Sequence, residues 1–519
     1  MTSEKHQTKT GGRDATNGVI PGRIALSVGK PESQTPQGWI WAKLTDVARL
    51  ETGHTPSRKY PEYWDGDIPW IGIKDATSNH GKVIQDTYQH ATQLGIDNSS
   101  ARLLPKNTVC LSRTASIGYV VIMGQPMATS QDFVNWVCSD KLDYRYLASI
   151  LFAERSSYTL FSRGTTHQTI YFPEVKAFHV LLPPIKEQRH AADVIWALND
   201  KIEINYRINQ TLEQMAQALF KSWFVDFEPV KAKIAARERW QALQPDNESA
   251  SPVCYAADLD ERPAIDDLET TMNRAAMQAI SGKTAAQLDA LRGEDPERYH
   301  ELYETAALFP SAMQDSELGE IPEGWELSTV GKEFDVTMGQ SPPGDTYNET
   351  GEGLPFFQGR RDFGERFPSN RVYCTQPKRM ARWDDTLLSV RAPVGDTNIA
   401  LTDCCIGRGL AAIKHKSGCS SFTYYSVIQL GHALSSYDSE GTVFGSINQK
   451  NLKSISQLAP PHGVLSSFQK TAKALDELIR VNSNEVASLA AMRDTLLPKL
   501  LSGELTPSEA EEAHPEATA

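Results

Sequence analysis

Residues 198–223 read LNDKIEINYRINQTLEQMAQALFKSW, and the spacing of their apolar side chains determines how the chain is organised. The apolar positions alternate between steps of four and three residues, beginning at Leu198 and Ile202. That alternation is typical of an α-helix that packs along a second helix in a coiled coil. The sequence predicts a long helix after Pro183-Pro184, with a seam formed by Leu198, Ile202, Asn205, Asn209, Leu212, Ala216, Leu219 and Trp223.

A second seam of the same kind lies 277 residues further along the chain. In it Asn482 corresponds to Asn205, and a polar residue in a seam commonly sets the register of the helices. The alternative is that each helix packs only on its own globular domain, but two long seams favour pairing of one helix with the other. Antiparallel pairing is the simplest arrangement within one chain, and it would place the globular domains at opposite ends of a rod. The second seam comprises Leu475, Ile479, Asn482, Val486, Leu489, Arg493, Leu496 and Leu500.

The two seams belong to a repeat that spans most of the chain. Pro36-x-Gly38-Trp39 recurs as Pro322-x-Gly324-Trp325, and Gly53-x-x-Pro56 recurs as Gly339-x-x-Pro342, both at an offset of 286. From Gly164-Thr165 onward the offset is 277. Glycine, proline and aromatic markers in one order at constant offsets indicate a duplication. Short β-prone runs and Gly/Pro turns precede each long helix, and a helical stretch near residues 142–161 interrupts the strands of the first copy, which is typical of an α+β domain.

We therefore expect an α+β protein with two tandem domains, an antiparallel two-helix coiled coil and an internal pseudo-twofold repeat. The domains are predicted at residues 36–186 and 322–462, and the helices at 187–230 and 463–502. Residues 231–321 are predicted to form an acidic, partly helical linker, with helices at 268–280 and 285–291. The tails at 1–35 and 503–519 are expected to be disordered, and the second tail is acidic.

The composition indicates a water-soluble globular protein, with 519 residues and 40% hydrophobic residues. The chain has no apolar run of membrane-spanning length, and its N-terminus lacks a signal-peptide core, so no membrane partner is expected. Its seven scattered cysteines suit a reducing cytoplasm. The net charge of −13 argues at first against a nucleic-acid partner. However, the linker contributes −9 and the C-terminal tail −5, so both domains are near neutral and can carry a local basic face.

Motifs for catalysis or cofactor binding are incomplete. Gly282-Lys283-Thr284 ends like a phosphate-binding loop, but Met277 stands where the first glycine is required. The loop Ser341-Pro342-Pro343-Gly344 lacks the amide or carboxylate and the aromatic residue that an amino-methyltransferase needs there. The histidines lack metal-ligand spacing. We therefore expect no catalytic residue, metal or cofactor in this chain.

Four segments carry a family resemblance. Residues 219–231 read LFKSWFVDFEPVK, residues 493–505 read RDTLLPKLLSGEL, residues 315–325 read DSELGEIPEGW, and Pro183-Pro184 is followed by Glu187-Gln188. Together they resemble the DNA-specificity subunit (S subunit) of a type I restriction–modification enzyme over about residues 36–505. Two features depart from the family pattern. The second copy has Pro460-Pro461-His-Gly-Val-Leu in place of the Glu-Gln motif, and the linker is long.

The resemblance implies a subunit that directs chemistry done by others. Each of two target-recognition domains would read one half of an asymmetric bipartite site in double-stranded DNA. The helices would set the spacer and dock two methyltransferase (M) subunits, which use S-adenosylmethionine and flip the target adenine. Motor–nuclease (R) subunits would use ATP and Mg²⁺ to cut unmethylated DNA. The chain itself would be a non-catalytic, cytoplasmic subunit.

Candidate DNA contacts are polar or basic side chains on loops after strands, because base edges and phosphates are bound by such groups. Arg113 and Arg391 rank first because an arginine recurs after a hydrophobic strand in both copies. For each candidate the alternative is a solvated charge or a strand-end salt bridge. The candidates are Lys74, Arg113, Thr166, His167, Gln168, Arg360, Arg361, Arg391, Asn448, Gln449 and Lys450.

Candidates for helix pairing and partner docking lie on the two seams and at the end of the first helix. Trp223, Phe224 and Phe227 form an aromatic group there, for which core packing is favoured over docking. The candidates are Leu198, Ile202, Asn205, Leu212, Leu219, Trp223, Phe224, Leu475, Ile479, Asn482, Leu489 and Leu496.

Two other functions stay open from the residues alone. One is a stand-alone enzyme with a duplicated domain, which would methylate or cleave DNA without partners. The other is a non-catalytic DNA-binding scaffold or regulator without bipartite specificity, which would protect no defined sequence in footprinting.

Overall fold

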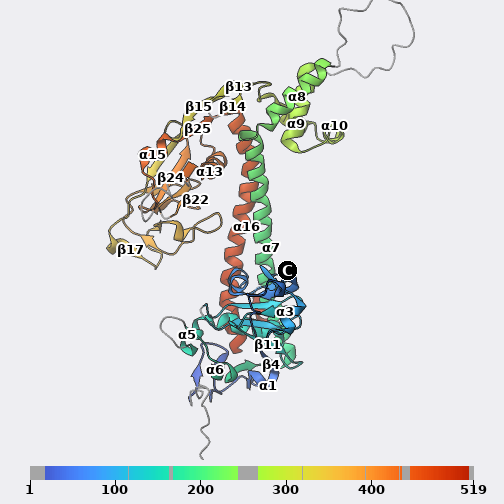
Figure 1. The fold of residues 1–519 in the computed structure, drawn as a ribbon. Helices are drawn as coiled ribbons and strands as arrows, with labels where there is room; N and C mark the ends of the chain where they lie inside the picture. The colour runs from blue at the N-terminus through green and yellow to red at the C-terminus, as the bar shows by residue number, and fades with distance from the viewer. Residues whose placement is uncertain are drawn as a thin grey trace, which may run out of the picture. The chain divides into compact units, whose positions relative to one another are not determined.

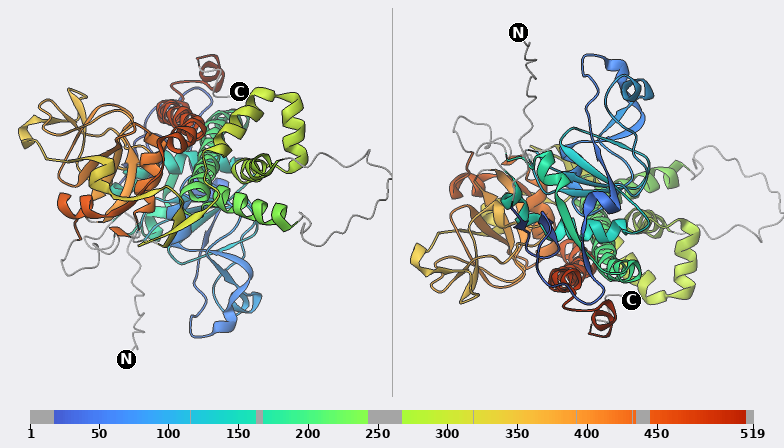
Figure 2. Two further views of the ribbon diagram at one scale, coloured as in Figure 1. Left: turned by 90° about the horizontal axis from the view of Figure 1, so that it is seen from above. Right: turned by 90° about the horizontal axis from the view of Figure 1, so that it is seen from below.

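The structure is a computed structural model, and it describes residues 18–114, 116–162, 168–242, 267–317, 319–391, 393–431, 433–434 and 445–513. The chain forms two compact units (Figures 1 and 2). Unit 1 contains residues 1–207 and 482–519, and unit 2 contains residues 208–481. Each unit therefore combines one globular domain with one part of each long helix.

Over its described residues, unit 1 contains three sheets with strand orders β4-β11-β8-β9-β6, β10-β5-β7 and β1-β2-β12-β3. Its core lies where apolar side chains of β8, β9 and β11 pack against helix α4 and the two long helices. The elements are β1 (Ile20–Pro21), β2 (Leu26–Val28), β3 (Ile40–Lys43), α1 (Leu44–Val47), β4 (Ala48–Thr52), β5 (Trp64–Ile71), α2 (Ile73–Ser78), β6 (Val83–Ile84), β7 (Gln89–Ala91), α3 (Gln93–Asp97), β8 (Val109–Ser112), β9 (Val120–Met123), β10 (Ala128–Thr129), β11 (Phe133–Cys138), α4 (Tyr144–Ala153), α5 (Tyr158–Phe161), α6 (Phe172–Lys176) and β12 (Phe178–Leu182).

Unit 2 repeats this plan with small changes. Its four sheets have the orders β16-β24-β21-β22, β17-β19-β18-β23-β20, β15-β25 and β13-β14. The elements are β13 (Met313–Ser316), β14 (Gly319–Pro322), β15 (Glu326–Thr329), α12 (Val330–Glu333), β16 (Phe334–Met338), β17 (Tyr347–Asn348), β18 (Leu354–Phe357), β19 (Tyr373–Cys374), β20 (Met380–Ala381), β21 (Thr386–Val390), β22 (Val394–Ile399), β23 (Cys404–Ile406), β24 (Leu410–His415), α13 (Ser420–Gln429), α15 (Gln449–Ser454) and β25 (Ser456–Ala459).

The long helices α7 (Ile185–Phe224) and α16 (His462–Ser502) pair antiparallel (Figure 1). In unit 1, Arg493 Nη1 donates to Asn199 Oδ1 at 3.2 Å, and Asn205 Nδ2 donates to Glu485 Oε2 at 2.9 Å. In unit 2, the ring centres of Phe220 and Phe468 are 5.8 Å apart. Residue numbers rise along one helix as they fall along the other, as antiparallel pairing requires. The predicted α+β fold with tandem domains and an antiparallel coiled coil is confirmed.

The prediction that residues 1–35 are disordered is wrong for residues 18–35. Strand β2 pairs with β12, and Leu26 and Val28 are buried. The buried carboxylate of Glu154 accepts hydrogen bonds from the backbone N–H groups of Ile24 (2.6 Å) and Ala25 (2.7 Å). Burial of apolar side chains and this long-range hydrogen bonding order a segment that has no periodic pattern of its own.

The C-terminal tail also departs from the prediction of disorder over 503–519. Helix α17 (Pro507–Ala513) begins after Thr506, whose N–H donates to Glu509 Oε2 at 2.8 Å. Ala510 is buried in the core of unit 1, and Leu505 packs against the same core. Residues 507–513 therefore form a short helix capped at Thr506 rather than a solvated chain.

The described residues 228–242 and 267–307 form four helices, and the last three of these share a small core (Figure 2). Helices occur at both stretches predicted to be helical. Lys233 Nζ donates to the Phe309 carbonyl at 2.6 Å, and burial lowers the pKa of Lys233 to about 8. The segment is thus a folded part of unit 2 over its described residues. The helices are α8 (Glu228–Ala242), α9 (Leu268–Ser281), α10 (Ala285–Glu294) and α11 (Pro296–Ala307), and the core comprises Ala276, Met277, Leu288 and Ala306.

Candidate nucleic-acid interface

In unit 1, the loops that follow β4, β5, β8 and β10 are joined by backbone hydrogen bonds. The N–H of His54 donates to Thr129 O at 2.9 Å, and that of Ser130 donates to Ile71 O at 2.9 Å. The N–H of Arg113 donates to Asp132 O at 2.7 Å, and that of Ile170 donates to Arg113 O at 2.9 Å. We call this assembly the first loop cluster. It comprises residues 53–56, 72–75, 113–114, 130–132 and 168–170.

Unit 2 contains the same four hydrogen bonds at positions displaced by 286 or 277 residues. They run from Gln340 N to Ile406 O (3.0 Å), Gly407 N to Phe357 O (2.8 Å), Val390 N to Gly409 O (2.9 Å) and Ile447 N to Val390 O (3.1 Å). This second loop cluster comprises residues 339–342, 359–362, 390–391, 407–409 and 446–448. The duplication has therefore preserved one hydrogen-bonded loop framework while the side chains on it differ.

The recurring Gly-x-x-Pro marker has a steric cause within these clusters. A Cβ on Gly53 would lie 1.9 Å from Ser130 O, and a Cβ on Gly339 would lie 2.1 Å from Gly407 O. Real Cβ atoms do not approach backbone oxygens so closely, so glycine is required at both positions. The sequence marker reports the close crossing of two loops.

A buried aspartate anchors the turn after β5 and the equivalent turn after β18. Asp75 is 3% exposed, and its Oδ2 accepts from Gly72 N at 2.9 Å. Asp362 is also 3% exposed, and its Oδ2 accepts from Gln358 N at 2.7 Å. The residue before each aspartate is an exposed cation, Lys74 or Arg361.

Lys74 and Arg361 are thus matched by structure as well as by charge. Lys74 Nζ lies 3.8 Å from the centre of the Tyr88 ring, a cation–π contact that leaves the side chain exposed. The neighbouring candidate Arg360 instead forms an ion pair with Asp396, although its side chain is 60% exposed. Of the two adjacent arginines, Arg361 is the structural counterpart of Lys74.

The expected equivalence of Arg113 and Arg391 is wrong by one residue. Thr114 bridges Thr169, and Arg391 bridges Ser446 in the same way, so Arg391 corresponds to Thr114. Successive side chains of an extended segment point to opposite sides, so one step changes the environment completely. Arg391 is exposed, whereas Arg113 is half-buried against the Phe172 ring at 4.5 Å.

Arg113 has a structural role in the first cluster. Its Nη2 donates to Gln131 O at 3.2 Å, which supports the loop after β10. Burial lowers the pKa of Arg113, and the charge of Asp132 opposes that change. The side chain therefore holds a loop in position.

The remaining candidates occupy varied positions. Gln168 and Lys450 are exposed, and Thr166 and His167 lie outside the described residues. Asn448 caps α15, because its Oδ1 accepts from Asn451 N at 2.9 Å. Gln449 Nε2 donates to Val336 O at 3.2 Å. Asn448 and Gln449 therefore support the fold at the edge of the second cluster.

Sequence reasoning missed the pair Gln131 and Arg408. Both are exposed at the same point of the two frameworks. The Thr55 hydroxyl hydrogen-bonds Gln131 in the first cluster, and Arg408 N donates to the Ser341 hydroxyl at 3.4 Å in the second. A Cβ at Gly407 or Gly409 would lie within 3.0 Å of Gln358 backbone atoms, so these glycines allow the Arg408 loop to pack closely. The sequence signal for this pair was Gly407-Arg408-Gly409, because the offset of 277 places Gln131 opposite Arg408 in the first copy.

The exposed side chains of the two loop clusters are suited to binding. Exposed cations can contact phosphates or the acceptor edge of guanine, and exposed amides can pair with adenine. Among the described residues, no group of three or more His, Cys, Asp or Glu side chains could hold a metal ion. The six cysteines in the described ranges are unpaired, and Cys404 and Cys405 face different apolar clusters.

The coiled-coil candidates on α7 and α16 are buried or half-buried in the structure. Leu198, Ile202, Asn205, Ile479, Leu489 and Leu496 are buried, and Leu212, Leu219, Leu475 and Asn482 are half-buried. Trp223 is fully buried and Phe224 nearly so, in a cluster with Phe422 and Phe468. Core packing accounts for these two aromatic residues, and partner docking is excluded for Trp223.

Comparisons with known proteins identify relatives of this chain. A family model described as "Type I restriction modification DNA specificity domain" matches residues 36–214. The HindI specificity subunit of Haemophilus influenzae is 32% identical over 66% of this chain and 72% of its own length. A putative MjaX specificity subunit of Methanocaldococcus jannaschii is 36% identical over 44% of this chain. The matched region covers about half (54%) of the length of that relative.

A crystal structure of an S subunit from M. genitalium covers 91% of this chain and 98% of its own, at 14% identity and a TM-score of 0.49. None of the helices in the described ranges has the length and apolar content that crossing a bilayer requires. Given its similarity to the HindI subunit over most of that protein, this chain belongs to the specificity subunits of type I restriction enzymes.

Proposed function

We propose that each loop cluster reads one half of a bipartite DNA site on behalf of a type I restriction–modification complex. The observation that carries this proposal is the pair of matched frameworks, which hold different exposed side chains at equivalent positions. Two similar frameworks with different side chains are suited to two different half-sites. The resulting target is asymmetric.

The side chains divide by their chemistry. Lys74 and Arg361, at one matched position, would position phosphates, because an exposed cation present in both copies suits a contact that carries no sequence information. Gln131 and Arg408, at the other, would contact base edges, because an amide suits adenine and a guanidinium fork suits guanine. Arg391 adds a further exposed cation in the second cluster only.

The paired helices would set the spacer and offer docking faces to two methyltransferase subunits. The repeat supports this, since a pseudo-twofold object presents equivalent faces to two identical partners. Methyl transfer from S-adenosylmethionine would occur on those partners, and cleavage driven by ATP and Mg²⁺ on motor–nuclease subunits. The specificity subunit itself would be non-catalytic.

The charge distribution supports a shared DNA affinity. The excess of acid lies in residues 231–321 and 503–519, while the globular domains are near neutral. Phosphate contacts supply much of the affinity of DNA-binding proteins. We therefore expect weak DNA binding by the subunit alone and tight binding once the methyltransferase subunits are present.

The test is to co-express the chain with its methyltransferase and to map methylated adenines in the host genome. The expected result is one motif with two defined half-sites and a fixed gap, present only with this subunit. A scaffold without bipartite specificity would give no defined motif. Methylation by the purified chain alone would overturn the non-catalytic assignment.

A further inference from the structure

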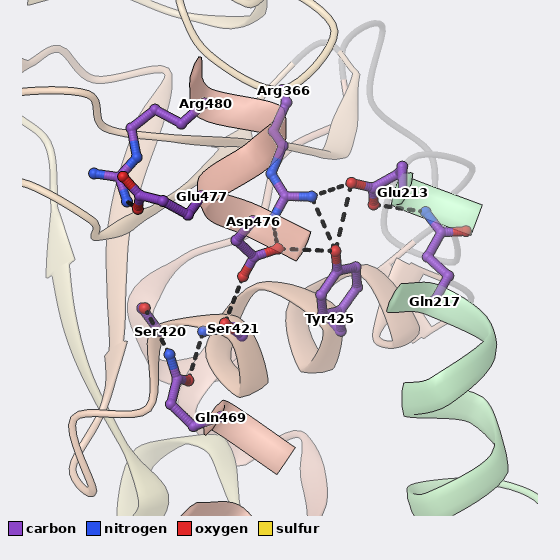
Figure 3. Close-up of polar contacts among 10 residues, drawn as sticks. All are labelled: Glu213, Gln217, Arg366, Ser420, Ser421, Tyr425, Gln469, Asp476, Glu477 and Arg480. Carbon is purple, nitrogen blue, oxygen red and sulfur yellow. Dashed lines mark hydrogen bonds and ion pairs between the residues drawn. The ribbon is translucent and has the colours of Figure 1, made fainter. Parts of the chain in front are cut away.

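The side chain of Arg366 joins the second recognition domain to both long helices within unit 2 (Figure 3). It is 5% exposed and forms ion pairs with Glu213 of α7 and with Asp476 of α16. Its Nη1 also donates to the Tyr425 hydroxyl at 2.9 Å, and the guanidinium carbon lies 4.5 Å from the centre of the Tyr424 ring. One guanidinium thus contacts two helices and the domain helix α13.

The partners of Arg366 are held in turn by further hydrogen bonds. The Ser421 hydroxyl donates to Asp476 Oδ2, and the Tyr425 hydroxyl donates to Asp476 Oδ1 at 3.3 Å. Burial alone would lower the pKa of Arg366, but Tyr425, Asp476, Tyr424 and Glu213 together raise it above its ordinary value. A buried charge is tolerated when it is paired and hydrogen-bonded in this way, and such a network fixes geometry.

Arg366 is also connected to the second loop cluster. It lies four residues after Asp362, and the intervening turn is held by buried Asn398. Asn398 Oδ1 accepts from Gly364 N at 3.1 Å, and Asn398 Nδ2 donates to Gly364 O at 3.2 Å. A short, hydrogen-bonded segment therefore runs from the exposed cation Arg361 to the helices.

The first domain has a different connection at the equivalent place. Ile122 N donates to Lys82 O at 3.0 Å, and Ile399 N donates to Arg366 O at 2.9 Å, which makes Lys82 the counterpart of Arg366. Lys82 forms an ion pair with Glu203 of α7, and among the described residues it has no such pair with α16. The two side chains are 47% and 29% exposed, and solvent-exposed pairs of this kind contribute little.

The other members of the Arg366 network also have small or neutral counterparts in unit 1. The offset of 277 matches Glu213 to Ala490 and Asp476 to Asn199, and alignment of α13 with α4 matches Tyr424-Tyr425 to Ala148-Ser149. These counterparts and Lys82 line one cavity of about 540 Å³ in unit 1. The place that Arg366 and its partners fill in unit 2 is thus a cavity in unit 1, whose other lining residues include Arg145, Phe152 and Arg493.

We infer that Arg366 is a positioning residue that fixes the second recognition domain to the paired helices, and that the first domain has no buried arginine between carboxylates of both helices at the equivalent place. This inference rests on the proposed function. Together with the apolar core, the guanidinium between two carboxylates then fixes the position of the second half-site relative to the helices. The spacer preference of the complex accordingly depends on this joint as well as on helix length, and not on the Lys82 pair.

The experiment uses the full chain with its methyltransferase and a library of sites in which the gap between the half-sites is varied. Arg366→Met is compared with the matched variant Lys82→Met. Arg366→Met should leave both half-site sequences unchanged but lower the preference for the native gap about tenfold. Lys82→Met should keep that preference. Arg366→Lys keeps the charge but has no planar fork to reach both carboxylates. Its preference for the native gap should therefore lie between those of Arg366→Met and Lys82→Met.

Since Arg366→Met leaves the half-buried carboxylates of Glu213 and Asp476 without their cationic partner, Glu213→Gln is measured alongside it as a milder change that keeps the Asp476 pair. It should relax the gap preference in the same direction. Properly assembled Arg366→Lys and Glu213→Gln complexes with the native gap preference would overturn the inference. A wild-type complex without any defined motif would instead overturn the proposed function, so the two failures are distinguishable.

Discussion

Gln131 and Arg408 occupy the same position in the two recognition domains. Each follows the strand that pairs in parallel with the strand preceding the aspartate-anchored turn. Each also contacts a hydroxyl residue of the Gly-x-x-Pro loop, Thr55 or Ser341. An amide and a guanidinium at one exposed site differ in hydrogen-bonding pattern, which is the property that base reading requires.

Arg408→Gln is therefore expected to alter only the second half-site. Loss of a guanidinium fork should cost about 1–3 kcal/mol of discrimination at one base pair. The measurement is the methylated motif of the variant complex. Arg382→Gln is the matched control, because Arg382 is exposed and pairs with Asp403, which precedes β23 at its opposite end. If both variants kept the wild-type motif, Arg408 would not read a base.

Gly53→Ala and Gly339→Ala should each disable one half of the recognition. A Cβ at either glycine overlaps a backbone oxygen of the crossing loop, so the loops must separate. The expected loss of stability is about 1–3 kcal/mol, as for overpacking elsewhere, measured by urea unfolding. Gly53→Ala should weaken selection of the first half-site and Gly339→Ala that of the second.

The control for these substitutions is Gly344→Ala. A Cβ at Gly344 would meet no atom within 4 Å, so stability and motif should be unchanged. A stable Gly53→Ala variant with unaltered selectivity would show that the loop crossing is dispensable.

How far the sequence could predict this protein depends on whether a feature repeats along the chain. The coiled-coil seam could be predicted, because each of its contacts recurs every three or four residues. The ordered N-terminal segment could not, because strand β2 has only three residues and is held by Glu154 from far along the chain. Short strands stabilised at long range leave no periodic trace.

The candidate site was predictable in location and less so in detail. Loops after strands were expected, and both clusters form there. The predicted equivalence of Arg113 and Arg391 was wrong because it aligned the two copies by their hydrophobic runs. The bridges Thr114–Thr169 and Arg391–Ser446 show that Arg391 corresponds to Thr114. A one-residue error in an extended segment exchanges exposed and buried sides.

His80 should make the stability of unit 1 depend on pH. Its Nδ1 accepts from Val120 N at 3.0 Å, and its ring stacks on Phe152 with centres 4.9 Å apart. Burial, with the charges of Arg155 and Arg493, lowers the pKa of His80 to about 4. The unfolded state therefore binds a proton near pH 6.5 that the folded state binds only near pH 4.

The contribution of His80 is present above pH 6.5 and is lost as the pH falls toward 4. After allowance for partial solvent exposure it amounts to about 1–2 kcal/mol. His80→Gln retains an acceptor for Val120 and does not titrate, so the difference in unfolding free energy between wild type and variant should shrink between pH 7 and pH 4.5. A titration of the His80 ring followed by NMR that gave a pKa near 6.5 would contradict this explanation.

Removing one heptad from each long helix should shorten the gap between the half-sites. Deletion of residues 205–211 and 479–485 removes facing parts of the antiparallel pair, as the Asn205–Glu485 hydrogen bond indicates, and keeps the seam in phase on both helices. Seven residues correspond to about 10 Å of helix, which is about three base pairs of DNA. Three base pairs also turn the groove by about a third of a turn, so affinity should fall while both half-site sequences stay the same. Methylation of a spacer library measures both effects. If the shortened subunit still preferred the native gap, helix length would not determine the spacing, and the gap would have to be set by the domains themselves.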